Sequence, residues 1–224
     1  MIELNKISMM YNDNGTKINA LKLNELKIKD GEKIAFIGSS GCGKTTLFNL
    51  ISGMITPTEG NVVVQNVDLT TLTESERDLF RANHIGYIFQ DFNLFNEFTV
   101  LENVILPMSF SKRYSKKDME KKAYEILKKV GIVEKTNQKV KTLSGGEKQR
   151  VAIARSIVNK PNIILADEPT GNLDYKNGVK IMELIKKVSE DEKATLLVIT
   201  HNNSQLEMFD RVVNIEEINE AIKS

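Results

Sequence analysis

The segment from Gly38 to Thr45 constrains the fold of this chain more than any other. It reads Gly-Ser-Ser-Gly-Cys-Gly-Lys-Thr and fits the pattern G-x-x-x-x-G-K-[ST]. Residues 33–37 before it form an apolar run typical of a buried strand, and residues 44–52 are compatible with a helix. Between a strand and a helix, this pattern predicts a phosphate-binding loop, because the glycines let successive backbone N–H groups face inward at a helix N-terminus.

The residue types of this loop match a nucleoside triphosphate. Lys44 is expected to reach the β- and γ-phosphates and to assist catalysis, and the Thr45 hydroxyl is expected to bind Mg²⁺. The rest of the expected ATP contacts are Gly38, Ser39, Ser40, Gly41, Cys42, Gly43 and Thr46. The alternative is a chance Gly/Ser loop with an exposed lysine, which the flanking strand and helix disfavour. We interpret Cys42 as a passive filler; a reactive thiol of low pKa beside Lys44 is the other interpretation.

The remaining patterns predict an α/β fold with a mainly parallel sheet. Residues 85–89, 163–166 and 195–200 are apolar throughout, as in buried parallel strands, and helical segments separate them. The first thirty residues alternate around a turn at 12–15, which predicts an N-terminal antiparallel β layer. A helix-spaced pattern over 99–131, with Gly131 as the C-cap, predicts a helical insert. We expect a single domain over 1–224, with the helical subdomain at about 95–160.

Composition excludes some classes of protein. Lys and Arg number 31 against 30 Asp and Glu, so binding to nucleic acid through net charge is not expected. Most of the lysines between 112 and 141 read as a solvated helix face; attraction to anionic lipid headgroups is the alternative. A single cysteine excludes an internal disulfide and favours a reducing compartment. No apolar run is long enough to cross a bilayer, and we expect a cytoplasmic protein.

Two further segments carry charge and exposed N–H groups. Residues 163–166 lead into Asp167 and Glu168, which strand alternation points in different directions. Asp167 suits contact with Mg²⁺ and Glu168 suits activation of the attacking water; a helix cap or solvated turn is the alternative. Ser144 and Glu147 form a capping box around a glycine pair at a helix start. This is either a well-capped helix or a second anion site.

The sequence Leu143-Ser144-Gly145-Gly146-Glu147 resembles the signature motif of ATP-binding cassette proteins, and the order of motifs matches that family over nearly the whole chain. The resemblance implies a P-loop NTPase core and further ATP contacts. Tyr11 stacks on adenine, Gln90 contacts Mg²⁺ and water, and His201 contacts the γ-phosphate. Their alternatives are a strand aromatic, an exposed turn residue and a helix cap.

The resemblance also implies an ATP-dependent, head-to-tail homodimer. Ser144, Gly145 and Gly146 of one copy close over ATP held by the phosphate loop of the other, and Asp174 lies near the opposite site. ATP closes the dimer and hydrolysis loosens it. The motion drives an integral membrane permease on the cytoplasmic face of the membrane. Phe92, Leu94 and Phe95 either form a groove for a helix of that partner or belong to the core.

Residues 166–174 and 89–104 are similar to the branch that includes lipoprotein-release, macrolide-export, antimicrobial-peptide and cell-division (FtsE-like) subunits. This implies an ATPase that powers export or extraction; the alternative is an FtsE-like cell-division ATPase without transport. A scaffold with little turnover and a soluble cassette acting on nucleic acid or the ribosome are rivals of other classes. The sequence departs from the family at Asn202, where Asp is frequent, and after residue 212, where a closing glycine turn is missing.

Overall fold

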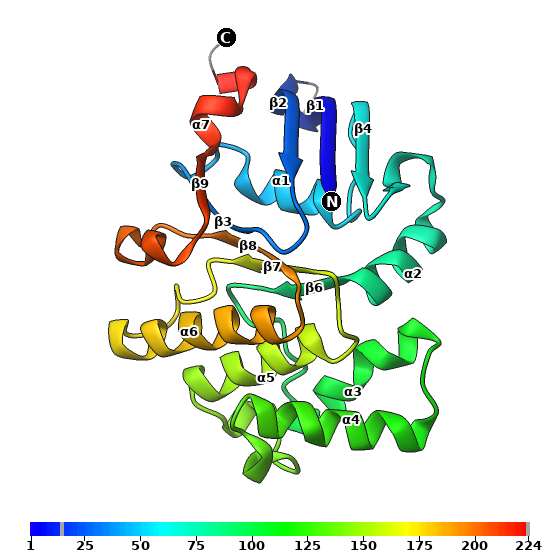
Figure 1. Cartoon of the computed structure of the whole chain (residues 1–224), viewed down its shortest axis with the longest axis vertical. Coiled ribbons are helices and arrows are strands. Elements are labelled where there is room, and N and C mark those ends of the chain that lie inside the picture. The colour runs from blue at the N-terminus through cyan, green and yellow to red at the C-terminus, as the bar shows by residue number, and fades with distance from the viewer. Residues whose placement is uncertain (14–15, 223–224) are drawn as a thin grey trace. The chain divides into compact units, whose positions relative to one another are not determined.

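The computed structural model describes residues 1–13 and 16–222 of the chain (Figure 1). It divides into two compact units, one formed by Met1–Arg81 with Ile199–Ser224 and the other by Ala82–Val198. The first unit contains both ends of the chain and the second contains the predicted helical insert. No helix of the described part is long and apolar enough to cross a membrane.

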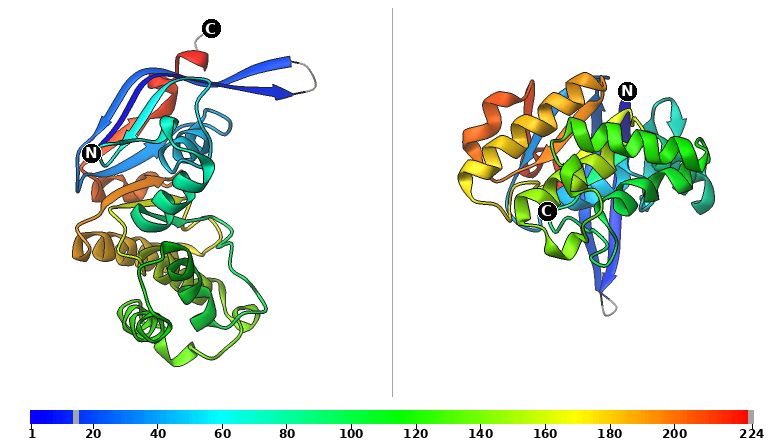
Figure 2. Two further views of the ribbon diagram at one scale, coloured as in Figure 1. Left: turned by 90° about the vertical axis from the view of Figure 1, so that its right-hand side faces the viewer. Right: turned by 90° about the horizontal axis from the view of Figure 1, so that it is seen from below.

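The antiparallel layer predicted for the first thirty residues is present in the first unit. Its strands are β1 (Ile2–Asp13), β2 (Thr16–Ile28), β4 (Glu59–Val64) and β5 (Val67–Asp68), in the order β2-β1-β4-β5. The hairpin of β1 and β2 extends away from the sheet (Figure 2). Of the predicted turn at 12–15, residues 14 and 15 lie outside the described residues.

A bulge in β1 sets which side chains face the core. The register against β4 shifts between Asn5 and Ser8, and Lys6 has a φ of 50°. Even-numbered residues such as Ile2 and Leu4 are buried before the bulge, and odd-numbered residues such as Ile7 and Met9 are buried after it. The reason is that one extra residue inverts the alternation of a strand.

The rest of the first unit carries the phosphate loop. β3 (Lys33–Ile37) pairs in parallel with β9 (Arg211–Asn214), and the loop joins β3 to α1 (Lys44–Ile51). Phe36 and Phe48 pack edge to face with 5.8 Å between ring centroids, which fixes α1 on β3. The other elements are η1 (Leu69–Thr71), α2 (Glu74–His84), which runs past the boundary of the unit, η4 (Asn203–Met208), α7 (Ile215–Ile218) and η5 (Glu220–Ile222).

The second unit combines buried strands with the helical insert. β6 (Ile85–Ile88) pairs in parallel with β7 (Ile163–Asp167), and β8 (Thr195–Ile199) is the next strand. The helices are α3 (Val100–Ser111), α4 (Lys116–Lys129), α5 (Gly145–Ile157) and α6 (Tyr175–Asp191), with short turns η2 (Val133–Lys135) and η3 (Val140–Thr142). α3, α4 and α5 pack on one another (Figure 1).

Local sequence signals explain where the helices of the insert begin and end. Thr99 with Glu102 forms a capping box before α3, and the Ser115 side chain caps α4. The helical pattern over 99–131 is interrupted at Lys112, which has a left-handed backbone with φ of 57°. Gly131 follows α4 with a φ of 71° and donates its N–H to the Lys128 carbonyl, which confirms the predicted C-terminal glycine.

Candidate functional site

The phosphate loop of the first unit is closed on itself by its lysine. Lys44 is only 7% exposed, and its Nζ donates to the carbonyls of Gly38 and Ser39, at 2.7 Å each. Nζ also lies 3.8 Å from Cys42 Sγ. The buried ammonium therefore lies within the curve of the loop, where it places a positive charge beside any bound phosphate.

Glycine is required where the loop enters α1. Gly43 precedes the helix with a φ of 102°, and a Cβ there would lie 2.8 Å from the Ala20 carbonyl oxygen. No side chain caps α1 and no acidic residue lies in its first turn, so the helix itself does not offset the positive potential at its start. Loop and helix start therefore fit an anion, as the sequence predicts.

The second unit brings Gln90 and Glu168 together. β7 ends at Asp167, and Glu168 follows with a φ of 43°, which turns the chain sharply at the strand end. A Cβ placed on Gly171 would lie 3.2 Å from Gln90 Nε2 and 3.6 Å from Glu168 Oε2. Both side chains thus approach the same glycine, and an amide group lies near the carboxylate that we expect to activate water.

Two polar residues without a role predicted from the sequence hold these segments. Asn172 Nδ2 donates to the Gln90 carbonyl and to Asp91 Oδ1, at 3.0 Å each. Gln149, fully buried on α5, donates to the Pro169 carbonyl at 2.7 Å. Gln149 could have been found from the sequence, because it is a polar residue at a position of the predicted helix that the apolar pattern places in the core.

Arg155 on α5 holds the backbone that follows Gln90. It donates to the carbonyls of Phe92, at 2.7 Å, and Asn93, residues whose φ values are 62° and 47°. Burial lowers the pKa of the Arg155 guanidinium to about 10. A cation is stable in this environment because it donates to two carbonyls that the left-handed turn points toward it.

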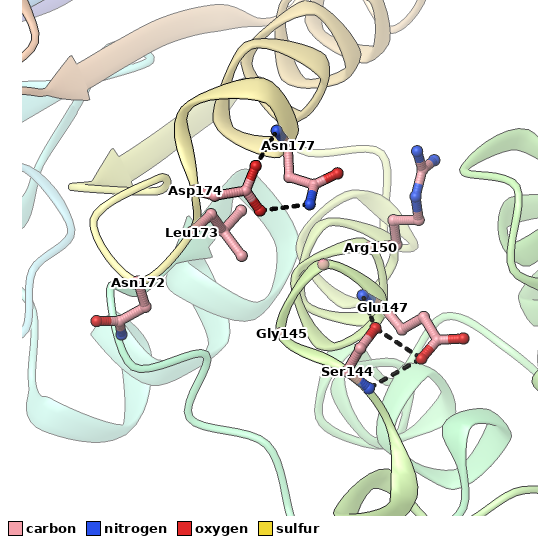
Figure 3. A pocket seen from close by; sticks show the side chains of 9 residues that line it. Ser144, Gly145, Glu147, Arg150, Asn172, Leu173, Asp174 and Asn177 are labelled. Atoms are coloured by element: carbon pink, nitrogen blue, oxygen red, sulfur yellow. Dashed lines mark hydrogen bonds between the residues drawn. The ribbon is translucent and has the colours of Figure 1, made fainter.

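The glycine pair at the start of α5 faces an open pocket of about 420 Å³ (Figure 3). The predicted capping box is present: Ser144 N and Oγ each lie 2.8 Å from Glu147 Oε2, and Glu147 N lies 3.4 Å from Ser144 Oγ. A Cβ on Gly146 would meet no atom within 4 Å. The pocket is lined by Ser144, Gly145, Gly146, Glu147, Arg150, Asn172, Leu173, Asp174 and Asn177.

Asp174 contributes to this pocket from the start of α6. Its carboxylate caps the helix, accepting from Asn177 N at 3.1 Å and from Asn177 Nδ2 at 2.5 Å (Figure 3). The backbone N–H of Asn177 is the main cause of the lowered pKa of Asp174. Asp174 and the glycine pair thus border one pocket of a single chain, and the placement of Asp174 near a partner's site stays a prediction.

The other expected contacts lie in the first unit. Tyr11, on β1, pairs with Ile18 of β2 and is 41% exposed, so its ring is accessible to a ligand. His201 is exposed and directly follows β8. At Asn202, where the family frequently has Asp, the side chain accepts from Ser204 N and caps η4, a role that Asp would fill as well.

The sequence left open whether Phe92, Leu94 and Phe95 form a groove for a partner helix or belong to the core, and the structure decides this for Phe95 alone. Phe92 and Leu94 are half-buried, whereas Phe95 is 51% exposed and stacks on Phe98 with 5.2 Å between ring centroids. Phe95 is therefore not a core residue. A groove for a partner helix at these residues stays a prediction.

A family model described as ABC transporter matches residues 21–171. The chain belongs to the ABC transporter family. This ABC protein is 42% identical to the uncharacterized ABC transporter ATP-binding protein MJ0796 of Methanocaldococcus jannaschii, over 97% of the chain and 94% of the relative. It is 40% identical to the lipoprotein-releasing system ATP-binding protein LolD of Francisella tularensis, over 96% and 93% respectively.

Solved structures agree with this assignment. The ABC protein superimposes with a TM-score of 0.88 on a dimeric post-hydrolysis state of the cassette MJ0796 bound to ADP and Pi, at 40% identity over 99% of this chain and 95% of that one. A second dimeric structure of MJ0796 gives a TM-score of 0.87 at 41% identity, over 96% and 95%. The α/β cassette fold is thereby confirmed, and the chain is an ATP-binding ATPase subunit of this family.

Proposed function

We propose that two copies of the chain bind MgATP between them, head to tail, and hydrolyse it to power export or extraction by a separate integral membrane permease. The observation that carries this proposal is the presence of two glycine-rich helix starts in one chain, the phosphate loop before α1 and the glycine pair opening α5, each of a kind suited to bind an anion. Dimeric structures of a similar cassette support the pairing of two copies. The site is then complete only in the dimer.

The phosphate loop and Lys44 hold the phosphates, and Tyr11 stacks on the adenine. Mg²⁺ neutralises charge on the phosphate oxygens when it is bound. The donors proposed for it are the Thr45 hydroxyl, the Gln90 amide oxygen and the Asp167 carboxylate. These are hard oxygen ligands of the kind that Mg²⁺ prefers, and the abrupt end of β7 leaves Asp167 only partly buried.

Glu168 takes the role of general base, and Gln90 orients the water on which it acts. Their common approach to Gly171 supports this pair. His201 contacts the γ-phosphate. Ser144 and the N–H groups of Gly145 and Gly146 approach the nucleotide of the partner, with Asp174 beside them, and their open pocket in the single chain supports that role.

The relatives support the proposed partner and location. The lipoprotein-releasing relative supports a transport role over an FtsE-like role in cell division. The proposed substrate is a lipoprotein, a macrolide or an antimicrobial peptide, the classes that the resemblance to this branch implies. The chain then works at the cytoplasmic face of the membrane, bound to its permease and to a second copy of itself, without nucleic acid.

The direct test is Glu168→Gln, which keeps the shape of the side chain and removes the base. We expect ATP binding to persist, hydrolysis to fall to background and dimers to accumulate, measured by phosphate release and light scattering. Glu125→Gln is the matched control, because it makes the same charge change on the exposed face of α4. Undiminished turnover in Glu168→Gln would remove Glu168 from the base role.

A further inference from the structure

The C-terminal segment 214–222 lies against the outer side of the phosphate loop. In place of the missing closing glycine turn, β9 leads through Asn214 directly into α7 and η5. Two polar side chains of this segment, Glu216 and Asn219, contact the loop at its two ends. All of these residues belong to the first unit.

Asn219 joins the end of the loop to β2 and is fully buried. Its Nδ2 donates to the carbonyls of Cys42, at 3.0 Å, and Ala20, at 3.2 Å. Its Oδ1 accepts from Lys22 N, at 2.9 Å, and Ala221 N, at 3.0 Å. Both amide hydrogens and both oxygen lone pairs are thus used, which makes this a fully satisfied buried group.

These contacts determine the direction of a backbone N–H group. In a planar trans peptide, the carbonyl of one residue and the N–H of the next point in opposite directions. Because Asn219 binds the Cys42 carbonyl, the Gly43 N–H points away from Asn219. The fit is close, since a Cβ on Gly43 would lie 3.3 Å from Asn219 Nδ2.

Glu216 acts on the first peptide of the loop in the same manner. Its Oε1 accepts from Ser39 N at 3.0 Å and also from the Ser39 hydroxyl, while the Gly38 carbonyl of that peptide accepts from Lys44 Nζ. Lys44 and Glu216 therefore hold one peptide from opposite sides. The Ser39 hydroxyl is the main cause of the lowered pKa of Glu216, so the carboxylate is ionised at neutral pH.

We propose that Asn219 and Glu216 are positioning residues that brace the phosphate loop from outside and set its affinity for nucleotide. Neither residue needs to touch ATP: Asn219 orients the Cys42–Gly43 peptide and Glu216 the Gly38–Ser39 peptide. This deepens the proposed function and rests on binding of ATP by this loop. Holding the Gly43 N–H in direction and the backbone at Gly38 and Ser39 in place lowers the ordering cost of binding, so the affinity is higher with the brace than without it.

The experiment compares variants of the full chain by titration with a fluorescent ATP analogue and with ATP as competitor. Glu216→Ala removes the acceptor at a half-buried position, and we expect its Kd for ATP to rise by about fivefold, which is about 1 kcal/mol. Glu216→Gln keeps an oxygen acceptor and should stay within about twofold of the wild type. Asn219→Asp keeps Oδ1 but turns an oxygen toward two carbonyls, and should raise the Kd by at least about tenfold.

Glu220→Ala is the matched control, because Glu220 lies in the same segment and binds Asn24 and Lys22 of β2. Its Kd should equal that of the wild type. The melting temperature of each variant without nucleotide shows whether it folds. If Asn219→Asp does not fold, the Kd values of the two Glu216 variants test the inference.

The inference is overturned if Glu216→Ala binds ATP as tightly as Glu220→Ala, or if Glu216→Gln loses as much affinity as Glu216→Ala. A folded Asn219→Asp with unchanged affinity also overturns it. Failure of the wild type and Glu220→Ala to bind ATP would instead refute the proposed function.

Discussion

Gly146→Ala separates a binding role of the glycine pair from a structural one. Gly146 is the second residue of α5, and a Cβ placed there would meet no atom within 4 Å. The described residues around this position therefore leave room for a side chain. If glycine is needed so that a phosphate of the partner's nucleotide can approach the backbone, the Gly146→Ala protein should be stably folded but have low ATPase activity.

The expected effect of Gly146→Ala on stability is opposite in sign to its expected effect on activity, and the two differ in size. Alanine in a helix is favoured over glycine by about 0.5–1 kcal/mol, so the free energy of unfolding should rise by up to that amount. A hydrogen bond to a charged group contributes about 1.5–3 kcal/mol, so losing one at the glycine pair should lower kcat/KM about 10- to 100-fold. Stability and activity thus change in opposite directions.

The assay measures phosphate release over a range of MgATP concentrations, which gives kcat/KM, together with urea unfolding of the nucleotide-free chain. ATP binding to the single chain should be unchanged, since it depends on the phosphate loop of the same copy. A Gly146→Ala protein with wild-type turnover would refute the reasoning. So would a protein whose lost activity is matched by a clear fall in the unfolding free energy.

Three further predictions concern the second unit. Gly86→Ala should destabilise the chain by about 3 kcal/mol in urea unfolding, because its Cβ would lie 2.3 Å from the Ser156 carbonyl oxygen and force α5 away from β6. Arg155→Met should lower kcat about tenfold with ATP affinity within about twofold, measured by phosphate release and titration, because it frees the backbone after Gln90. The pKa of Glu147 is lowered mainly by the Ser144 N–H, so its contribution to stability is complete above its ordinary value of 4.5 and lost as pH falls through the folded value. The difference in melting temperature between wild type and Glu147→Gln should therefore be constant near neutral pH and shrink below about pH 4.5; a difference that grows in acid would contradict this.

The sequence predicted the elements of the site because their signals are local. The strand, glycines and lysine of the phosphate loop are contiguous, and the capping box of Ser144 with Glu147 needs only four residues. The antiparallel layer and the start of α1 at Lys44 were predicted for the same reason. A motif of contiguous residues predicts its own backbone conformation, because the residue types at each position are the ones that this conformation requires.

The supporting contacts were not predictable because they join residues far apart in the chain. Asn172 with Gln90, Arg155 with Phe92, and Asn219 with Cys42 depend on packing, and a single polar residue does not identify its partner. The bulge at Lys6 was likewise missed, since the alternation of apolar residues in β1 does not reveal where one is inserted.

The central claim is that ATP is held from both sides by two copies of the chain. The most direct measurement is the mass in solution of Glu168→Gln with MgATP, compared with the double variant Glu168→Gln/Gly146→Glu. Glutamate in the first turn of α5 suits the helix, and the space there is open, but its charge repels a phosphate. The account predicts twice the monomer mass for the first protein and the monomer mass for the second, with ATP bound in both. Equal masses for the two ATP-bound proteins would contradict it.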